Sequence, residues 1–152
     1  AARWIGLHLP PGERDRLAAF VVGFEMAARL GNNGLGQVMN LRGFHSTGVF
    51  GCLSSATSAS VLLGLDEDGI RNALGAAATQ VGGLVGSFGT MAKPFHAGKA
   101  AMNGILSAEL AAEGFIAAQD MLEPEGPLLT TLVQDTARLL QRRDPAGTWE
   151  LP

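Results

Sequence analysis

The chain has 152 residues, a net charge of −3 and a single cysteine, Cys52. This length suffices for one domain with its own core, and the cysteine count excludes an intrachain disulfide or a multi-cysteine metal site. Charged residues make up only 16% of the chain and glycine takes 21 positions, against roughly 25% charged residues and about 7% glycine in soluble domains. The shortage of charge predicts that other protein covers much of the surface. Eleven scattered basic residues argue against nucleic acid as a partner.

Two segments without full charges, 43–65 and 72–92, raise the question of membrane spans. Both are rich in glycine, serine, threonine and other small residues, whereas membrane spans consist mainly of large apolar residues. We therefore expect both segments to form buried core and no part of the chain to cross a membrane. No leader signature opens the sequence, so we expect a cytoplasmic protein. The first residue is Ala1, which fits a piece of a longer polypeptide.

Helical periodicity dominates the sequence and no strand alternation stands out, so the predicted fold is all-α, a multi-helix bundle. The first predicted helix covers 13–30, with acidic residues in its first turn and Gly31 at its end. Residues 31–34 form a loop by their turn residues. The second helix begins at Ser46 or Thr47 and ends at Gly64. Its many small residues predict close packing on most of its sides.

The third predicted helix begins at 65–68, where an N-cap precedes acidic residues, and ends near 82–83. A glycine-rich stretch, 82–96, then leads to a fourth helix over about 97–113. A fifth helix covers 128–142, with a proline at its start and arginines at its end. Residues 149–151 fit the opening of a strand.

His45 precedes the second predicted helix, within residues 43–48 (GFHSTG). The plainer interpretation is a capping or packed loop histidine. The functional interpretation is an acid/base group beside a helix N-terminus, where free N–H groups and the helix dipole attract carboxylates. Ser46 or Thr47 is expected to cap the helix.

Lys93 and His96 lie on the glycine-rich stretch ahead of the fourth predicted helix. A solvated lysine and a packed histidine are the plainer interpretations, but together the two side chains would form a second anion site. Two such sites predict a binder of a polycarboxylate. Lys99, inside the helix, is expected at the surface or an interface, and Cys52 is expected to be a buried small residue.

Several separated motifs resemble the MmgE/PrpD family. They are GFHSTG at 43–48, GLDE at 64–67 with ALG at 73–75, and GTMAKPFHAGKAA at 89–101, together with VGFE at 22–25 and EGF at 113–115. Their order and spacing agree over about 17–123. The chain departs from the family pattern at Ser46, where members commonly have proline, and at Ala92, where they commonly have threonine. We expect these two positions to tune the loops or the substrate.

The resemblance implies the large helical domain of a homodimeric enzyme that needs no metal or organic cofactor. Residues 1–143 would be part of that domain, and 144–152 would be the start of the linker or strand entering a second, α+β domain, with the site between the two. His45 and Lys93 match residues that line the family's site. His45 would act as acid or base, and Lys93 would hold a substrate carboxylate and stabilise developing negative charge. Thr47 and His96 are further substrate-binding candidates.

The family includes 2-methylcitrate dehydratase, cis-aconitate decarboxylase and iminodisuccinate epimerase. We therefore expect the complete protein to be a lyase acting on a small di- or tricarboxylate, with dehydration of the 2-methylcitrate type, a step of propionate metabolism, as the first expectation. Decarboxylation of the cis-aconitate type, epimerisation and a non-catalytic helical dimerisation module are the alternatives. All three reactions move a proton next to a carboxylate, so the sequence leaves the choice open. The isolated chain is expected to be inactive.

Overall fold

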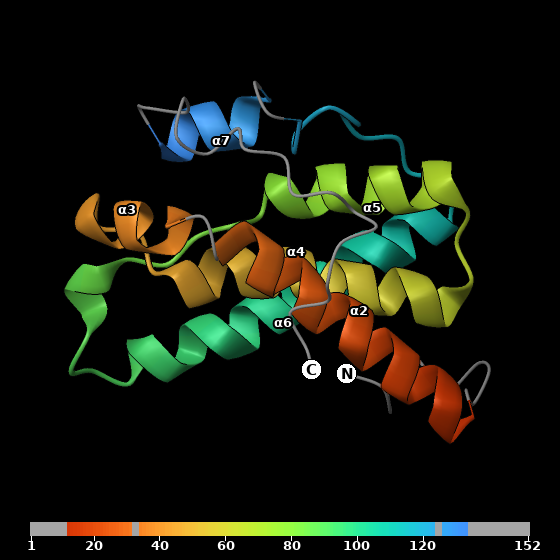
Figure 1. Cartoon of the computed structure of the whole chain (residues 1–152), viewed down its shortest axis with the longest axis horizontal. Coiled ribbons are helices and arrows are strands. Elements are labelled where there is room, and N and C mark those ends of the chain that lie inside the picture. Colours follow the sequence, from red (N-terminus) through yellow and green to blue (C-terminus); the bar gives the residue numbers. More distant parts are fainter. Residues whose placement is uncertain (1–11, 32–33, 124–125, 134–152) are drawn as a thin grey trace.

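The computed structural model describes residues 12–31, 34–123 and 126–133, and the regular elements in these ranges are all helices (Figure 1). Its elements in chain order are α2 (Glu13–Gly31), α3 (Leu35–Leu41), α4 (Ser46–Leu63), α5 (Glu67–Ala78), the 3₁₀ turn η1 (Val85–Ser87), α6 (Ala92–Ala112) and α7 (Pro127–Leu132). The described residues form no strand, only one isolated antiparallel bridge between Phe44 and Leu84. The all-α prediction is therefore confirmed.

Helix α4 is the centre of the bundle and packs against α2, α5 and α6 (Figure 1). Its small residues permit this close packing, as the sequence predicted. Ser54 and Ser58 donate hydrogen bonds to backbone carbonyls of α2, at 2.7 and 2.8 Å, and Ser55 donates one to α6 at 2.9 Å. On the α6 side, a Cβ on Gly104 would overlap the backbone of α4. The two helices approach this closely only because that position lacks a side chain.

The core follows α4 along its length. Val49, Cys52, Leu53 and Ala56 are almost fully buried, and Met39 of α3 packs into the same cluster. Among the described residues, α4 is the one helix long and apolar enough, by length and composition alone, to cross a membrane. Core helices meet the same criterion, and eight residues of α4 are buried against its neighbours.

The helix boundaries follow local chemistry where the sequence contains a clear signal. Asp66 caps α5 by accepting a hydrogen bond from the backbone N–H of Gly69 at 2.8 Å. Gly64 ends α4 in the left-handed conformation, with φ of 68°, which a residue with a side chain adopts at a cost. Pro127 begins α7 as predicted, at a position where no N–H is needed.

The structure differs from the prediction at four places. Helix α5 ends at Ala78, about four residues before the predicted end near 82–83. Helix α3 was not predicted, because only seven residues lie between two glycine-rich turns and few of them are buried. Helix α6 begins at Ala92, five residues earlier than expected. Pro94 is tolerated there because N–H groups in the first turn of a helix have no intrahelical partner. Helix α7 ends at Leu132, and Val133 is extended. The predicted continuation to 142 and the strand at 149–151 lie outside the described residues.

Candidate active site

The N-terminal ends of α4 and α6 meet at the segment that joins α5 to α6. The backbone N–H of His45 donates to the carbonyl of Gly83 at 3.0 Å, and Val85 donates to the carbonyl of Gly43 at 2.8 Å. These two bonds fix the segment against the residues that precede α4. Two loops separated by about forty residues of sequence are thereby joined at the point where the family motifs lie.

Gly48, in the first turn of α4, makes this junction possible. A Cβ at this position would overlap the backbone oxygen of Gly82. The joining segment therefore passes directly over α4, with Gly83 in a conformation (φ of 105°) that favours glycine. On its other side, Gly83 lies against the ring of His96.

His45 and His96 form a direct hydrogen-bonded pair. Their Nδ1 atoms are 2.9 Å apart, and His45 is only 8% exposed. Burial lowers the pKa of His45 below its usual value of 6.5, and the neighbouring His96 and Lys93 lower it further because positive charges repel a second proton. His45 is therefore neutral at pH 7 in the absence of a ligand and is able to accept a proton.

Lys93 and His45 both contact the ring of Phe88. The ammonium of Lys93 is 4.6 Å from the centre of the Phe88 ring, within the range of a cation–π interaction. The same ring meets His45 edge to face, with centroids 4.7 Å apart. Lys93 is exposed, so its ammonium remains available to a ligand carboxylate.

The structure thus brings together three of the four predicted site residues: His45, Lys93 and His96. Thr47 is exposed in the first turn of α4, and its side chain makes no hydrogen bond within the described residues. Its role in substrate binding stays a prediction.

Two local predictions at the site were wrong. Neither Ser46 nor Thr47 caps α4: His45 occupies the N-cap position without a side-chain bond, and Asn40 of α3 accepts from the N–H of Ser46 at 3.2 Å. Lys93 and His96 lie inside the first two turns of α6, not on a loop ahead of it. The helix fixes their relative directions, which a loop would not.

Two residues of the site were missed by the sequence analysis. Phe88 contacts both Lys93 and His45, and the hydroxyl of Ser87 lies 3.3 Å from Nε2 of His96. Their only sequence signal is their place on a glycine-rich stretch between two motifs. Which ring or hydroxyl faces the histidines depends on how that stretch folds.

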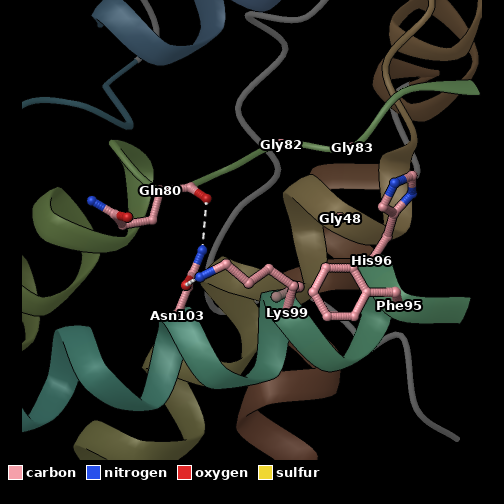
Figure 2. A pocket seen from close by; sticks show the side chains of 9 residues that line it. Gly48, Gln80, Gly82, Gly83, Phe95, His96, Lys99 and Asn103 are labelled. Carbon is pink, nitrogen blue, oxygen red and sulfur yellow. Dashed lines mark hydrogen bonds between the residues drawn. The ribbon is translucent and has the colours of Figure 1, made fainter. Parts of the chain in front are cut away.

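A pocket of about 200 Å³ adjoins His96 (Figure 2), and His45 is not among its lining residues. Lys99 crosses it and donates to the Asn103 side-chain oxygen at 2.7 Å, and Asn103 donates to the carbonyl of Gln80 at 3.0 Å. Lys99 is exposed, as predicted. The lining residues are Gly48, Gln80, Gly82, Gly83, Phe95, His96, Lys99, Ala100 and Asn103.

Possible metal ligands and the single cysteine complete the description of the site region. The part of the chain that the structure describes contains no group of three or more His, Cys, Asp or Glu side chains able to hold a metal ion. Cys52 is buried, its thiol lies 3.4 Å from the carbonyl oxygen of Ala77, and burial raises its pKa to about 11. A thiol of this kind is not a nucleophile at neutral pH, and the expectation of a buried small residue is confirmed.

The described part of the chain is thus an all-α domain with two histidines and a lysine where α4 and α6 meet. The family model described as the MmgE/PrpD N-terminal domain matches residues 1–139. The chain belongs to the MmgE/PrpD family, as the motifs predicted.

Curated relatives fall in the same family. The chain is 38% identical over 139 residues to the cis-aconitate decarboxylase-like protein oryM of Aspergillus oryzae, covering 90% of this chain and 29% of that protein. It is 38% identical over 110 residues to the cis-aconitate decarboxylase of Aspergillus terreus, covering 72% and 22%. For the cis-aconitate decarboxylase of Homo sapiens the values are 37% over 111 residues, covering 73% and 23%. The chain therefore spans less than a third of the length of these relatives.

Proposed function

We propose that this chain is the helical part of the active site of a lyase that decarboxylates cis-aconitate or a closely related tricarboxylate. The observation that supports the proposal most directly is the buried His45–His96 pair with the Lys93 ammonium beside it. The names of the relatives favour decarboxylation over dehydration of 2-methylcitrate, which was our first expectation from the sequence.

Decarboxylation demands two things of a site without an electron-accepting cofactor. When the C–C bond breaks and CO₂ leaves, its electron pair stays on the substrate and spreads toward a remaining carboxylate. A cation must stabilise that charge, and an acid must then deliver a proton to carbon. We assign the first task to Lys93 and the second to His45.

His45 must be protonated to act as this acid, although it is neutral in the empty site. A bound polycarboxylate supplies the change, because negative charge next to an imidazole favours its protonated form. Binding of the substrate thus promotes protonation of His45, the residue that then donates the proton. The exposed ammonium of Lys93 also attracts the anion toward His45.

Dehydration of a 2-methylcitrate-like hydroxy acid is the second candidate, and the lowered pKa of His45 favours it. A neutral imidazole is ready to remove a proton next to a carboxylate. The two reactions require opposite starting forms of His45, so the pH dependence of kcat/KM separates them.

We also propose that the complete protein is a homodimer whose other parts cover the charge-poor faces of this domain. Large apolar side chains on α2 and α6 support this view. Phe20 and Leu17 are 61% and 63% exposed, and Met102 and Leu106 are 53% and 49% exposed. Surfaces of this kind mark contacts with other protein.

The test uses the protein as it is encoded in full. Purified enzyme is given cis-aconitate or 2-methylcitrate, and released CO₂ and the unsaturated product are measured separately. Release of CO₂ from cis-aconitate supports the proposal, whereas product from 2-methylcitrate alone would replace it with the second candidate. Turnover of neither compound would overturn both.

Lys93→Ala is expected to lower turnover at least ~100-fold, the usual scale for losing one such electrostatic group. Arg71→Met is the matched control, because Arg71 is an exposed cation on α5 paired with Glu67. Near-normal turnover of Lys93→Ala would remove Lys93 from the assignment.

A further inference from the structure

The hydroxyl of Ser87 determines where the hydrogens of the histidine pair lie. Its oxygen is 2.7 Å from the carbonyl oxygen of Leu84 and 3.3 Å from Nε2 of His96. A carbonyl can only accept, and two oxygens at 2.7 Å without a hydrogen between them would repel. The single hydroxyl hydrogen therefore points to Leu84, and Ser87 is left to accept a hydrogen bond from His96.

The tautomer of His96 follows from this direction. To donate to Ser87, His96 must carry its hydrogen on Nε2. Neutral His96 then has a lone pair on Nδ1, the atom that lies 2.9 Å from Nδ1 of His45. That lone pair needs a donor, and only a hydrogen on Nδ1 of His45 supplies one.

We infer that Ser87 and His96 are positioning residues that hold neutral His45 in the Nδ1–H tautomer, so that Nε2 of His45 is the atom that exchanges protons with the substrate. The catalytic half of this inference rests on the proposed function. Both ring nitrogens of His96 are engaged, by His45 and Ser87. Its direct binding of substrate, which the sequence suggested, is thereby disfavoured.

The tautomer matters because His45 must work repeatedly without rearranging. Protonated His45 carries hydrogens on both nitrogens and donates the one on Nε2 to the substrate carbon. It then returns to the Nδ1–H form with its bond to His96 intact. The opposite neutral tautomer would place its lone pair against that of His96 at 2.9 Å, which is repulsive.

The same bond limits the pair to one positive charge. If both rings were protonated, two N–H groups would face each other across 2.9 Å. The titratable groups near His45 are His96 and Lys93, both on α6, and each opposes its protonation. From the joining segment, the uncharged ring of Phe88 faces His45. A bound anion is therefore what shifts the pair toward protonated His45.

The first experiment measures the tautomer without substrate. The complete protein is labelled with ¹⁵N-histidine and examined by NMR above pH 8, where ordinary imidazoles are neutral. His45 and His96 signals are assigned by their loss in His45→Gln and His96→Asn. Hydrogen on Nδ1 of His45 and on Nε2 of His96 is expected, and hydrogen on Nε2 of neutral His45 would overturn the inference.

The second experiment measures kcat and KM for the substrate that the complete protein turns over. His96→Phe is expected to lower kcat roughly 100-fold or more, since the wrong histidine tautomer costs about 10⁴ in a serine-protease triad. KM should change less than about threefold, because His96 does not bind substrate. His96→Asn, which offers an amide oxygen to Nδ1 of His45, should recover at least about tenfold of the loss.

Ser87 provides the variant that leaves both histidines in place. Ser87→Ala should mix the tautomers of His45 in the NMR experiment and lower kcat on the order of tenfold, the value of one hydrogen bond. Ser87→Thr, which keeps the hydroxyl, should restore the single tautomer of His45 and the kcat of the parent protein. Unchanged tautomers in Ser87→Ala would overturn the role of Ser87.

The outcomes separate this inference from the proposed function. A correct tautomer in a protein that turns over neither cis-aconitate nor 2-methylcitrate supports the hydrogen-bond chain and overturns the function. Turnover by a protein with the opposite tautomer of His45 supports the proposed function and overturns the inferred hydrogen-bond arrangement.

Discussion

Replacing Gly48 with alanine tests whether the junction between α4 and the joining segment positions His45 and His96. The new Cβ would overlap the backbone oxygen of Gly82, and no flexible side chain is available there to move aside. The segment must therefore shift away from α4. Its bond from His45 to Gly83 and its contact with His96 would shift with it.

The size of the effect follows from the displacement. Restoring van der Waals contact requires a movement on the order of 1 Å, and a misplacement of that size costs about 100-fold in rate. Overpacking costs about 1–3 kcal/mol, of which improved helix propensity returns up to about 1 kcal/mol. A large loss of kcat with a modest loss of stability is the expected combination.

The assay compares kcat and the unfolding midpoint of Gly48→Ala with those of Gly86→Ala in the complete protein. Gly86 lies on the same joining segment, and a Cβ there meets nothing within 4 Å. Its variant should keep both values close to those of the parent. A kcat for Gly48→Ala within threefold of the parent would refute the argument that this contact positions His45 and His96.

Further predictions concern pH and packing. If His45 delivers the proton, kcat/KM should fall as pH rises above its lowered pKa, whereas a rise with pH would identify His45 as a base and favour dehydration. Folding lowers the pKa of His45, so near and below pH 6.5 the unfolded chain binds more protons at this residue than the folded chain does. The contribution of neutral His45 to stability is therefore complete above about pH 6.5 and is lost as the pH falls through the lowered pKa. Unfolding midpoints between pH 5 and 8, compared with those of His45→Gln, measure this contribution. In α6, Gly104→Ala should destabilise by about 2 kcal/mol because its Cβ would overlap α4, while Gly98→Ala, in open space on the same helix, should stabilise by up to about 1 kcal/mol. Denaturant unfolding measures the free energy of unfolding of both glycine variants. Equal changes in the two would contradict the packing argument.

Local signals predicted the helices that have clear ends. The cap at Asp66 and the left-handed glycine at position 64 are determined by neighbours within a few residues. The start of α6 was misplaced because a proline is ordinarily a helix breaker, and its tolerance in the first turn depends on where the helix begins. Helix α3 is too short for periodicity to detect, and tertiary contacts bury Leu35 and Met39.

In the candidate site, too, some residues could be identified from local sequence and others only from the folded structure. The family motifs identified His45, Lys93 and His96 from the sequence, since each lies in a short run of characteristic residues. Nothing in those runs indicated that Ser87 and Phe88 face the histidines. Their positions follow from the bridge between Phe44 and Leu84, and such pairing depends on contacts made across forty residues of chain.

The sequence by itself determined the helical class, the family and the residue types available for proton transfer and anion binding. Only the tertiary structure decided that Nδ1 of His45 meets Nδ1 of His96, 51 positions away in the sequence. It also places the Ser87 hydroxyl 3.3 Å from Nε2 of His96. Residue types fix which groups can exchange a proton. The tautomer that does so is set by hydrogen-bond directions, and those exist only when distant segments have packed together.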